Sequence, residues 1–203
     1  MTQKERMLSG LLYDSSDPEL SQLRLKARRL ALRYNLLDEA EETERQEILK
    51  ELLPHGGKQI FLQPPVHFDY GCNTWFGENV SVNFNFTVLD CCPIHIGDNV
   101  MFGPNCTLAA PMHPLRWEER NIRTRPDGSL YNWEYAKPII IKRNCWIASN
   151  VTVCGGVVIG EGSVIGAGSV VTRDIPPHSL AAGNPCRVIR LITEADTMEL
   201  PEK

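Results

Sequence analysis

Residues 141–171 read IKRNCW IASNVT VCGGVV IGEGSV IGAGSV V when the chain is divided every six residues. An aliphatic residue opens every group. These opening positions are Ile141, Ile147, Val153, Ile159, Ile165 and Val171. Self-similarity at a fixed period is the sequence pattern of repeat architectures, and this run is too regular to be chance. The period of six therefore decides the fold.

The same spacing occurs earlier in the chain, with one two-residue slip between Cys91 and His95. The earlier opening residues are Phe76, Val82, Val88, Ile96, Phe102 and Leu108. Four residues after the opening position, a second small or apolar residue recurs in step. This second set is Val80, Phe86, Val100, Cys106, Cys145, Val151, Val157, Ser163 and Ser169. Glycine often follows the opening residue, where we expect a tight corner with no room for a Cβ atom. These glycines are at positions 77, 97, 103, 160 and 166.

A six-residue period fits one face of a triangular coil, with a short strand, a corner and one side chain directed inward. Three hexads complete one turn of ~18 residues, and stacked turns bury a continuous apolar column that no single repeat could bury alone. The sequence therefore predicts a mainly β protein built as a parallel β-helix.

The first part of the chain has the texture of helices. Thr2 and Glu5 have the spacing of a capping box, and Asp17 followed by Pro18 marks a second helix start. The second helix carries an amphipathic stripe. Its members are Leu20, Leu23, Ala27, Leu30 and Tyr34.

A third helix is expected over residues 38–53, with Asp38 and Glu41 as caps and Pro54 as the stop. We therefore divide the chain into three segments. They are an N-terminal helical segment at 1–57, a β-helix domain at 58–190 with a loop at 109–137, and a tail at 191–203.

The period disappears between Leu108 and Pro138, which is too long a gap for a passive connector in a compact solenoid. The loop contains His113 followed by a proline, four arginines and several aromatic residues. We expect this excursion to carry function.

Composition excludes several classes of protein. The 203 residues hold 21 Lys and Arg against 25 Asp and Glu, a net charge of −4, which argues against a nucleic-acid binder. No apolar stretch is long enough for a membrane span, and no secretory signal opens the chain, so we expect a cytoplasmic protein. The seven cysteines contain no CxxC pair, which favours reduced, mostly buried thiols over disulfides or zinc.

Several motifs make the chain similar to one family. They are Met7 to Asp14 (MLSGLLYD), Asp17 to Leu20 (DPEL), Asn83 to Asn85 (NFN), His113 to Leu115 (HPL), Ile165 to Thr172 (IGAGSVVT) and Gly183 to Ile189 (GNPCRVI). Together they span nearly the whole chain. The sequence resembles the galactoside and maltose O-acetyltransferases, sugar acetyltransferases of the hexapeptide-repeat superfamily.

This resemblance implies a left-handed coil, which the spacing alone does not give. It also implies acetyl-CoA as co-substrate, no required metal, a sugar acceptor, and a homotrimer with active sites between neighbouring subunits.

His113 is the candidate general base, because transfer to a sugar hydroxyl needs a group that removes its proton. The alternative is a hydrated loop histidine with no role. The resemblance implies that His113 deprotonates the acceptor, which attacks acetyl-CoA directly without a covalent enzyme intermediate. Asn83 follows an inward position, so its side chain should point outward and orient the acceptor or the base; the alternative is an asparagine ladder at a corner.

Four residues match positions where the family contacts or approaches the sugar, and charged groups make strong hydrogen bonds to hydroxyls. They are Asp14, Arg24, Asp69 and Glu134. Helix caps or solvated charges are the alternative for each.

Six residues match the family's acetyl-CoA site. They are Ser149, Ala167, Thr172, Arg173, Arg187 and Arg190. The backbone N–H of Ser149 is the candidate that holds the thioester oxygen, and a solvated basic face is the alternative for the arginines.

The chain also departs from the family pattern. Cys91 stands at a position that is acidic in the galactoside branch, Lys142 and Arg143 replace Gly-Asp, Ala148 replaces a glycine, and the loop is longer. These departures put the acceptor in doubt. The aromatic residues of the loop either form a platform for a sugar ring or fasten the loop. They are Trp117, Tyr131 and Trp133.

We therefore expect an acetyl-CoA-dependent O-acetyltransferase acting on a mono- or disaccharide of the maltose, glucose or galactoside type. The alternatives are a non-catalytic sugar- or CoA-binding relic and an acyltransferase with a non-sugar acceptor. A zinc hydro-lyase on the same fold would need three converging histidines, and only His95 and His113 are spaced one coil apart.

Overall fold

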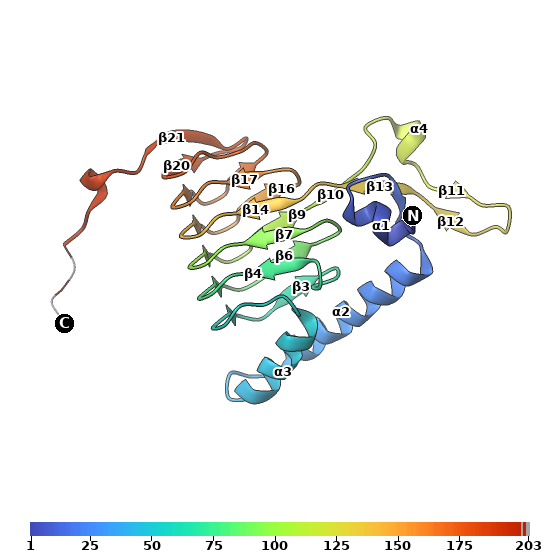
Figure 1. Cartoon of the computed structure of the whole chain (residues 1–203), viewed down its shortest axis with the longest axis horizontal. Helices are drawn as coiled ribbons and strands as arrows, with labels where there is room; N and C mark the ends of the chain where they lie inside the picture. Colours follow the sequence, from blue (N-terminus) through green and yellow to red (C-terminus); the bar gives the residue numbers. More distant parts are fainter. Residues whose placement is uncertain (200, 202–203) are drawn as a thin grey trace.

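Each hexad forms one short strand and one corner, and three such faces close a triangular coil. The computed structural model describes residues 1–199 and 201. The coils stack one on another, with helices over one end of the stack (Figure 1). Because strands one coil apart pair in parallel, each face of the prism is a parallel sheet.

Three sheets make the prism. The seven-stranded sheet contains β2 (Phe61–Leu62), β5 (Ser81–Val82), β8 (Met101–Phe102), β15 (Trp146–Ile147), β18 (Val164–Ile165), β20 (Ser179–Ala182) and β21 (Arg187–Leu191). The five-stranded sheet contains β3 (Val66–Phe68), β6 (Phe86–Leu89), β9 (Thr107–Ala109), β16 (Thr152–Cys154) and β19 (Val170–Val171). The four-stranded sheet contains β4 (Thr74–Phe76), β7 (Ile94–Ile96), β14 (Ile139–Ile141) and β17 (Val158–Ile159). All pairs in these sheets are parallel except β20 with β21, which turns back on the stack.

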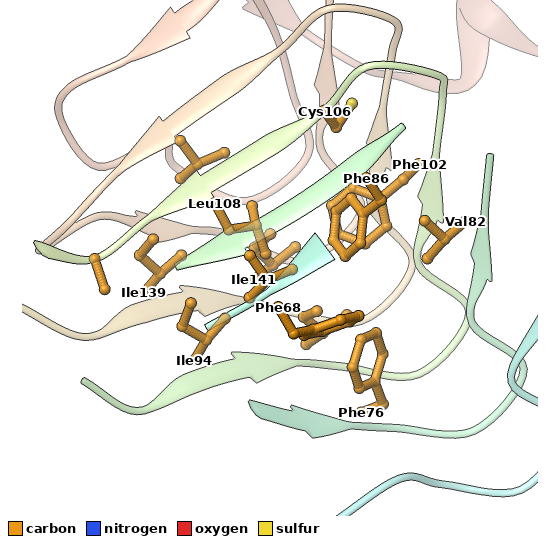
Figure 2. Packing of buried hydrophobic residues seen from close by; sticks show 14 of the residues in the cluster. Phe68, Phe76, Val82, Phe86, Ile94, Phe102, Cys106, Leu108, Ile139 and Ile141 are labelled. Atoms are coloured by element: carbon orange, nitrogen blue, oxygen red, sulfur yellow. The ribbon is translucent and has the colours of Figure 1, made fainter. Parts of the chain in front are cut away.

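The inward positions confirm the hexad register. All twelve opening residues of the two hexad sets are at most 5% exposed. The second small or apolar set is at most 1% exposed. Figure 2 shows the resulting column, in which Phe86 and Phe102 pack with ring centroids 4.9 Å apart. The mainly β class and the parallel β-helix are therefore confirmed.

The glycines after the opening residues confirm the expected corners with no room for a Cβ atom. A Cβ at Gly97 would lie 2.5 Å from the backbone nitrogen of Arg143 in the next coil. The left-handed backbone instead occurs three residues after the opening position, where asparagine stands in most coils and glycine in later ones. These asparagines are Asn79, Asn85, Asn99, Asn105, Asn144 and Asn150.

The N-terminal helices begin as predicted. The helix α1 (Gln3–Leu8) has the capping box of Thr2 and Glu5, and α2 (Pro18–Leu36) is capped by Asp17. The third helix, α3 (Glu42–Leu52), is shorter than the expected 38–53, because the Asp38 side chain accepts from the backbone N–H of Ala40 and forms a turn before the helix.

A buried polar seam joins these helices to the first coil. The Tyr34 hydroxyl of α2 donates to the carbonyl of Leu62 at 2.5 Å. The buried guanidinium of Arg45, from α3, donates to the same carbonyl and to the Tyr34 hydroxyl, both at 3.0 Å. Because these buried groups satisfy one another, the helices cover the open end of the apolar column without orphaned polar atoms.

The long excursion leaves the stack after β9 and returns at β14. It contains β10 (Pro111–Met112), α4 (Trp117–Arg120), β11 (Arg123–Thr124), β12 (Leu130–Tyr131) and β13 (Trp133–Ala136). β13 pairs antiparallel with β10 and with β1 (Tyr13–Asp14), while β11 and β12 form a hairpin that projects from the body (Figure 1). A short 3₁₀ turn, η1 (Glu194–Asp196), follows β21. Over residues 1–199 and 201, no helix combines the length and apolarity needed to cross a membrane.

Candidate active site

Interruptions of the strict hexad register fall on one edge of the prism. This edge, between the five-stranded and four-stranded sheets, is formed by residues 69–73, 90–93 and 109–138, and we call it the loop edge. Across the first two segments the inward positions are eight residues apart instead of six, from Phe68 to Phe76 and from Val88 to Ile96, and the third segment is the excursion. Since loops carry function on rigid scaffolds, this edge is where a site is expected.

The excursion connects the strand before His113 to the N-terminal segment through β13, which lies between β10 and β1. His113 follows β10, and Met112 of β10 is in register with Tyr135 of β13. Tyr13 of β1 is in register with Glu134 of β13, and the Tyr13 hydroxyl donates to Oε2 of Glu134 at 2.9 Å. The imidazole of His113 is exposed. A base candidate thus lies at the open side of a three-stranded sheet that also carries an acceptor candidate.

Helix α2 sends two arginines to the same edge. Arg24 donates to the Tyr70 hydroxyl at 2.7 Å and to the carbonyl of Ser15 at 2.6 Å. Arg28, one turn later, donates to Oδ1 of Asp69 at 2.6 Å. Four of the expected sugar contacts are therefore gathered at the loop edge with His113. They are Asp14, Arg24, Asp69 and Glu134.

Asp14 is almost buried and is already engaged. Its Oδ1 accepts from the backbone N–H and the hydroxyl of Ser16, at 2.9 and 2.7 Å. Its Oδ2 accepts from Arg125 of the excursion. The carboxylate therefore fixes local structure whether or not it also meets a ligand.

Cys91 lies between the acidic residues of this edge. Its thiol is 4.0 Å from Oδ2 of Asp69 and is buried. Burial, together with the negative charges of Asp69 and Glu134, raises the pKa of Cys91 to about 12. A hydrogen bond with Tyr13 lowers this pKa but does not offset the rise. The side chain is thus a neutral thiol at physiological pH.

A cavity opens beside Asp69. It measures about 390 Å³ and lies between α2 and the first strands of the five-stranded sheet, lined by Arg28, Leu32, His67 and Leu89 among others. A mixed apolar and polar lining of this kind suits a small organic molecule. This cavity has space for a ligand beside Asp69, whereas the carboxylate of Asp14 is surrounded by protein groups.

A second edge of the prism carries other candidates. The corners between the seven-stranded and five-stranded sheets, at 83–85, 103–105, 148–150 and 166–168, stack along what we call the Ser149 edge. Asn83, Ser149 and Ala167 all lie on it. The Asn83 side chain accepts from the backbone N–H of Phe84 at 2.8 Å, whereas the corner asparagines two residues later make the ladder, Asn85 donating to Asn105 at 2.9 Å.

The backbone of this edge presents free donors. Among the described residues, the amide N–H groups of Ser149 and Ala167 donate to no protein acceptor. Because unpaired backbone amides at a surface bind water or a ligand, the corner offers N–H groups to an oxygen. At Gly168 a Cβ would meet no atom within 4 Å, so the wall there is open.

The basic residues near the C-terminus are exposed. Arg173 follows β19, and Arg187 and Arg190 lie on β21. Arg190 pairs with both oxygens of Asp196, at 2.8 and 2.5 Å. Thr172 precedes Arg173 on the last turn of the loop edge, away from Ser149.

Most of the candidate site residues thus form two groups, which lie on different edges of the prism. His113 and the sugar candidates lie at the loop edge, while Asn83, Ser149 and Ala167 lie at the Ser149 edge. The five-stranded sheet, whose four-residue strand β6 spans about 13 Å, lies between the two edges.

Sequence reasoning missed several residues of the loop edge. Tyr13, Tyr70 and Arg28 make the bonds that hold Glu134, Arg24 and Asp69 in place. Tyr13 lies inside a motif that resembles the family, and Arg28 is four residues after Arg24 on one helix face, so these two patterns could have indicated them.

The loop aromatics mostly fasten the loop. Tyr131 and Trp133 meet edge to face with centroids 5.7 Å apart, and Arg125 covers the Tyr131 ring at 4.7 Å. Trp117 is 61% exposed. Of the two alternatives for these rings, the contacts favour fastening for Tyr131 and Trp133.

Residues 1–199 and 201 contain no group of three or more His, Cys, Asp or Glu side chains arranged to hold a metal. His95 stacks on Trp75 with centroids 4.8 Å apart, on the four-stranded sheet. All seven cysteines are free thiols, five of them buried.

Three family descriptions match segments of the chain. Residues 6–57 match the maltose acetyltransferase hexapeptide capping motif. Residues 138–173 match the bacterial transferase hexapeptide with six repeats, and residues 93–110 match the hexapeptide repeat of succinyl-transferase.

Full-length relatives share both sequence and structure with the chain. A galactoside O-acetyltransferase of Escherichia coli (strain K12) is 41% identical over 196 residues, covering 97% of this chain and 92% of that protein. The crystal structure of a maltose O-acetyltransferase from Clostridium difficile 630 is 42% identical, with a TM-score of 0.87 over 96% of this chain and 99% of that one. A galactoside acetyltransferase in complex with coenzyme A is 40% identical, with a TM-score of 0.88 over 97% of this chain and 94% of that one.

Proposed function

The chain belongs to the galactoside and maltose O-acetyltransferase family, and on that premise we propose that it transfers an acetyl group from acetyl-CoA to a hydroxyl of a mono- or disaccharide. The observation that supports the proposal is the sheet in which β13, carrying Glu134, pairs on one side with β10, the strand just before His113, and on the other with β1, the strand of Tyr13. The relative in complex with coenzyme A supports the donor.

The donor lies along the Ser149 edge. The free amide of Ser149 is positioned to hold the thioester oxygen, since backbone N–H groups stabilise the charge that develops on a carbonyl oxygen under attack. The small side chain of Ala167 leaves space for the pantetheine arm along this edge. Arg187 and Arg190, on β21 at the end of the stack, take the nucleotide end, where guanidinium groups suit phosphates. Thr172 and Arg173 approach the nucleotide from the last turn of the loop edge.

His113 acts as general base. Its imidazole takes the proton of the acceptor hydroxyl as the hydroxyl oxygen forms a bond to the thioester carbonyl carbon. The tetrahedral intermediate then collapses, the carbon–sulfur bond breaks, and the proton returns from the imidazole to the departing CoA sulfur. Asn83 orients the reacting groups from the Ser149 edge.

The acceptor lies at the loop edge. Asp69, Arg24 and Glu134 offer charged hydrogen-bond partners to sugar hydroxyls, and the cavity beside Asp69 has room for part of the sugar. The helical segment 1–57 thus contributes Asp14 and Arg24 to the site, and the β-helix domain 58–190 contributes the remainder.

The active site is completed between two copies of the chain. His113 and Ser149 lie on opposite sides of the five-stranded sheet, so the loop edge of one prism must meet the Ser149 edge of another. A homotrimer closes this heterologous contact into a ring with three equivalent sites.

A sugar panel tests the proposal. The protein is incubated with acetyl-CoA and glucose, maltose, galactosides or aminosugars, and the products are analysed by mass spectrometry, because seven cysteines interfere with thiol-release dyes. We expect one sugar to gain an acetyl group. Absence of acetylated product with every sugar, despite binding of acetyl-CoA, would move the acceptor outside carbohydrates or make the chain a non-catalytic binder.

A further inference from the structure

One side chain, Arg125, fastens the β11–β12 hairpin to the N-terminal segment. On the hairpin side its Nη1 donates to the Ser129 hydroxyl at 2.9 Å and to the Leu130 carbonyl at 3.2 Å. On the other side its Nη2 donates to Oδ2 of Asp14 and, at 2.9 Å, to the Ser16 hydroxyl. The guanidinium also lies 4.7 Å from the centre of the Tyr131 ring. It therefore bridges two segments that are more than a hundred residues apart in sequence.

The bridge is largely shielded from water. The side chain of Arg125 is 32% exposed and that of Asp14 is 12% exposed. A charged hydrogen bond in such surroundings is stronger than a pair on the open surface, which contributes little. The planar guanidinium, with its fixed fork of donors, is also the group that can satisfy four acceptors at once.

The other arginines of the excursion do not make this connection. Arg116 pairs with Glu118, and Arg120 and Arg123 donate to the carbonyls of Leu115 and Glu118. In the described part of the chain, these contacts all remain within the excursion. They provide matched controls of the same residue type.

The bridge lies next to the acceptor candidates. Asp14 is in register with Trp133, and the neighbouring pair in the same ladder is Tyr13 with Glu134. Ser15 adds a bond to Asn132 at 3.2 Å. A displacement of the hairpin would therefore also move Glu134, because only Asn132 and Trp133 lie between Glu134 and the end of β12.

We propose that Arg125 is a positioning residue for the acceptor, acting through Asp14 and the hairpin. Its bonds fix the plane of the Asp14 carboxylate, whose other oxygen is held by Ser16, and hold the hairpin as the outer wall of the loop edge. The inference rests on the proposed function, because it concerns which acceptors that site accepts. The Ser149 edge, where the proposed function places the thioester, lies across the five-stranded sheet, so we expect the binding of acetyl-CoA to be unaffected.

The test compares Arg125→Ala with the control Arg120→Ala and with Arg125→Lys. Steady-state kinetics give KM and kcat for the acceptor and for acetyl-CoA, and hydrogen exchange reports the amides of residues 122–131. We expect Arg125→Ala to raise the acceptor KM roughly tenfold and to change the ranking of acceptors, while the KM for acetyl-CoA stays within about twofold. Exchange in the hairpin should rise, and Arg125→Lys should be intermediate, because lysine keeps the charge but not the fork.

A double-mutant cycle tests whether Arg125 acts through Asp14. If it does, Asp14→Asn with Arg125→Ala together should raise the acceptor KM no more than the worse single variant. Equal acceptor KM values for Arg125→Ala and Arg120→Ala, or an equal rise in the KM for acetyl-CoA, would overturn the proposal. If the parent protein acetylates no sugar, the proposed function has failed. Independently of that result, unchanged hydrogen exchange of amides 122–131 in Arg125→Ala would contradict the claim that Arg125 fastens the hairpin.

Discussion

At the residue scale, Cys91 is the departure with the clearest physical consequence. A carboxylate at this position would add a third negative charge beside Asp69 and Glu134, whereas the thiol stays neutral. Burial and these two carboxylates raise the pKa of Cys91 to about 12, and burial raises that of Cys92 to about 11. The position thus reduces the negative charge of the loop edge rather than supplying a nucleophile.

The cysteines should therefore differ in their reaction with an alkylating reagent. At pH 8 a thiol of pKa 12 is ionised to about one part in 10⁴, and only the thiolate reacts. We expect iodoacetamide to modify Cys72 and Cys154, which are partly exposed, long before Cys91 or Cys92. Peptide mass mapping over time measures the order. Early modification of Cys91 in the folded protein would contradict its neutral, buried state.

At the element scale, the corners depend on asparagine. Asn99 has a φ of 55°, a left-handed conformation that costs most side chains about 1–2 kcal/mol. It also receives a bond from Asn79 at 3.3 Å and donates to Asn144 at 3.2 Å, which forms a ladder along one edge. The same residue thus relieves strain within a coil and links three coils.

Substitution of Asn99 separates these two roles. We expect Asn99→Ala to lower the free energy of unfolding by roughly 1–2 kcal/mol, because alanine has to adopt the costly left-handed backbone and also loses the ladder. Asn99→Gly should lose less, since glycine adopts this conformation readily. Urea unfolding at equal protein concentration gives the order. An alanine variant as stable as the glycine variant would show that the corner conformation is not what selects asparagine.

The hexad pattern was sufficient to predict the coils but not what surrounds them. Each inward position follows from local spacing, so Ile141 to Val171 could be placed from the sequence. The left-handed corners were not predicted, although asparagine or glycine stands three residues after nine of the twelve opening residues. The pairing of β1 with β13 was not visible, because it joins Tyr13 to Glu134 through a fold that has to form first.

At the scale of the whole molecule, the candidate residues lie on two edges of one prism. The composition of the site was predicted by resemblance, since residue types at matching positions are a property of the sequence. Its division between the loop edge and the Ser149 edge is a property of the folded coil, and so is the bridge from Arg125 to Asp14. Spacing along the chain does not give either.

Mixed oligomers test whether the site is shared between copies. His113→Ala removes the base from the loop edge, and Asn83→Ala removes a group from the Ser149 edge, so each variant alone should be nearly inactive. When the two are co-expressed with different tags and purified through both tags, only mixed trimers remain, and both edges are intact at about one in three of the shared sites. We expect about that fraction of the parent activity. Mixtures that remain as inactive as the single variants would place the whole site within one chain.

The most direct test of the central claim is the kinetics of His113→Ala with the best acceptor from the sugar panel. The account predicts that kcat falls by about 10² or more while the affinity for acetyl-CoA, measured by calorimetry, is almost unchanged, as expected for loss of a general base. His55→Ala, an exposed histidine on another face, is the matched control and should behave like the parent. Turnover by His113→Ala close to that of the parent would contradict the account.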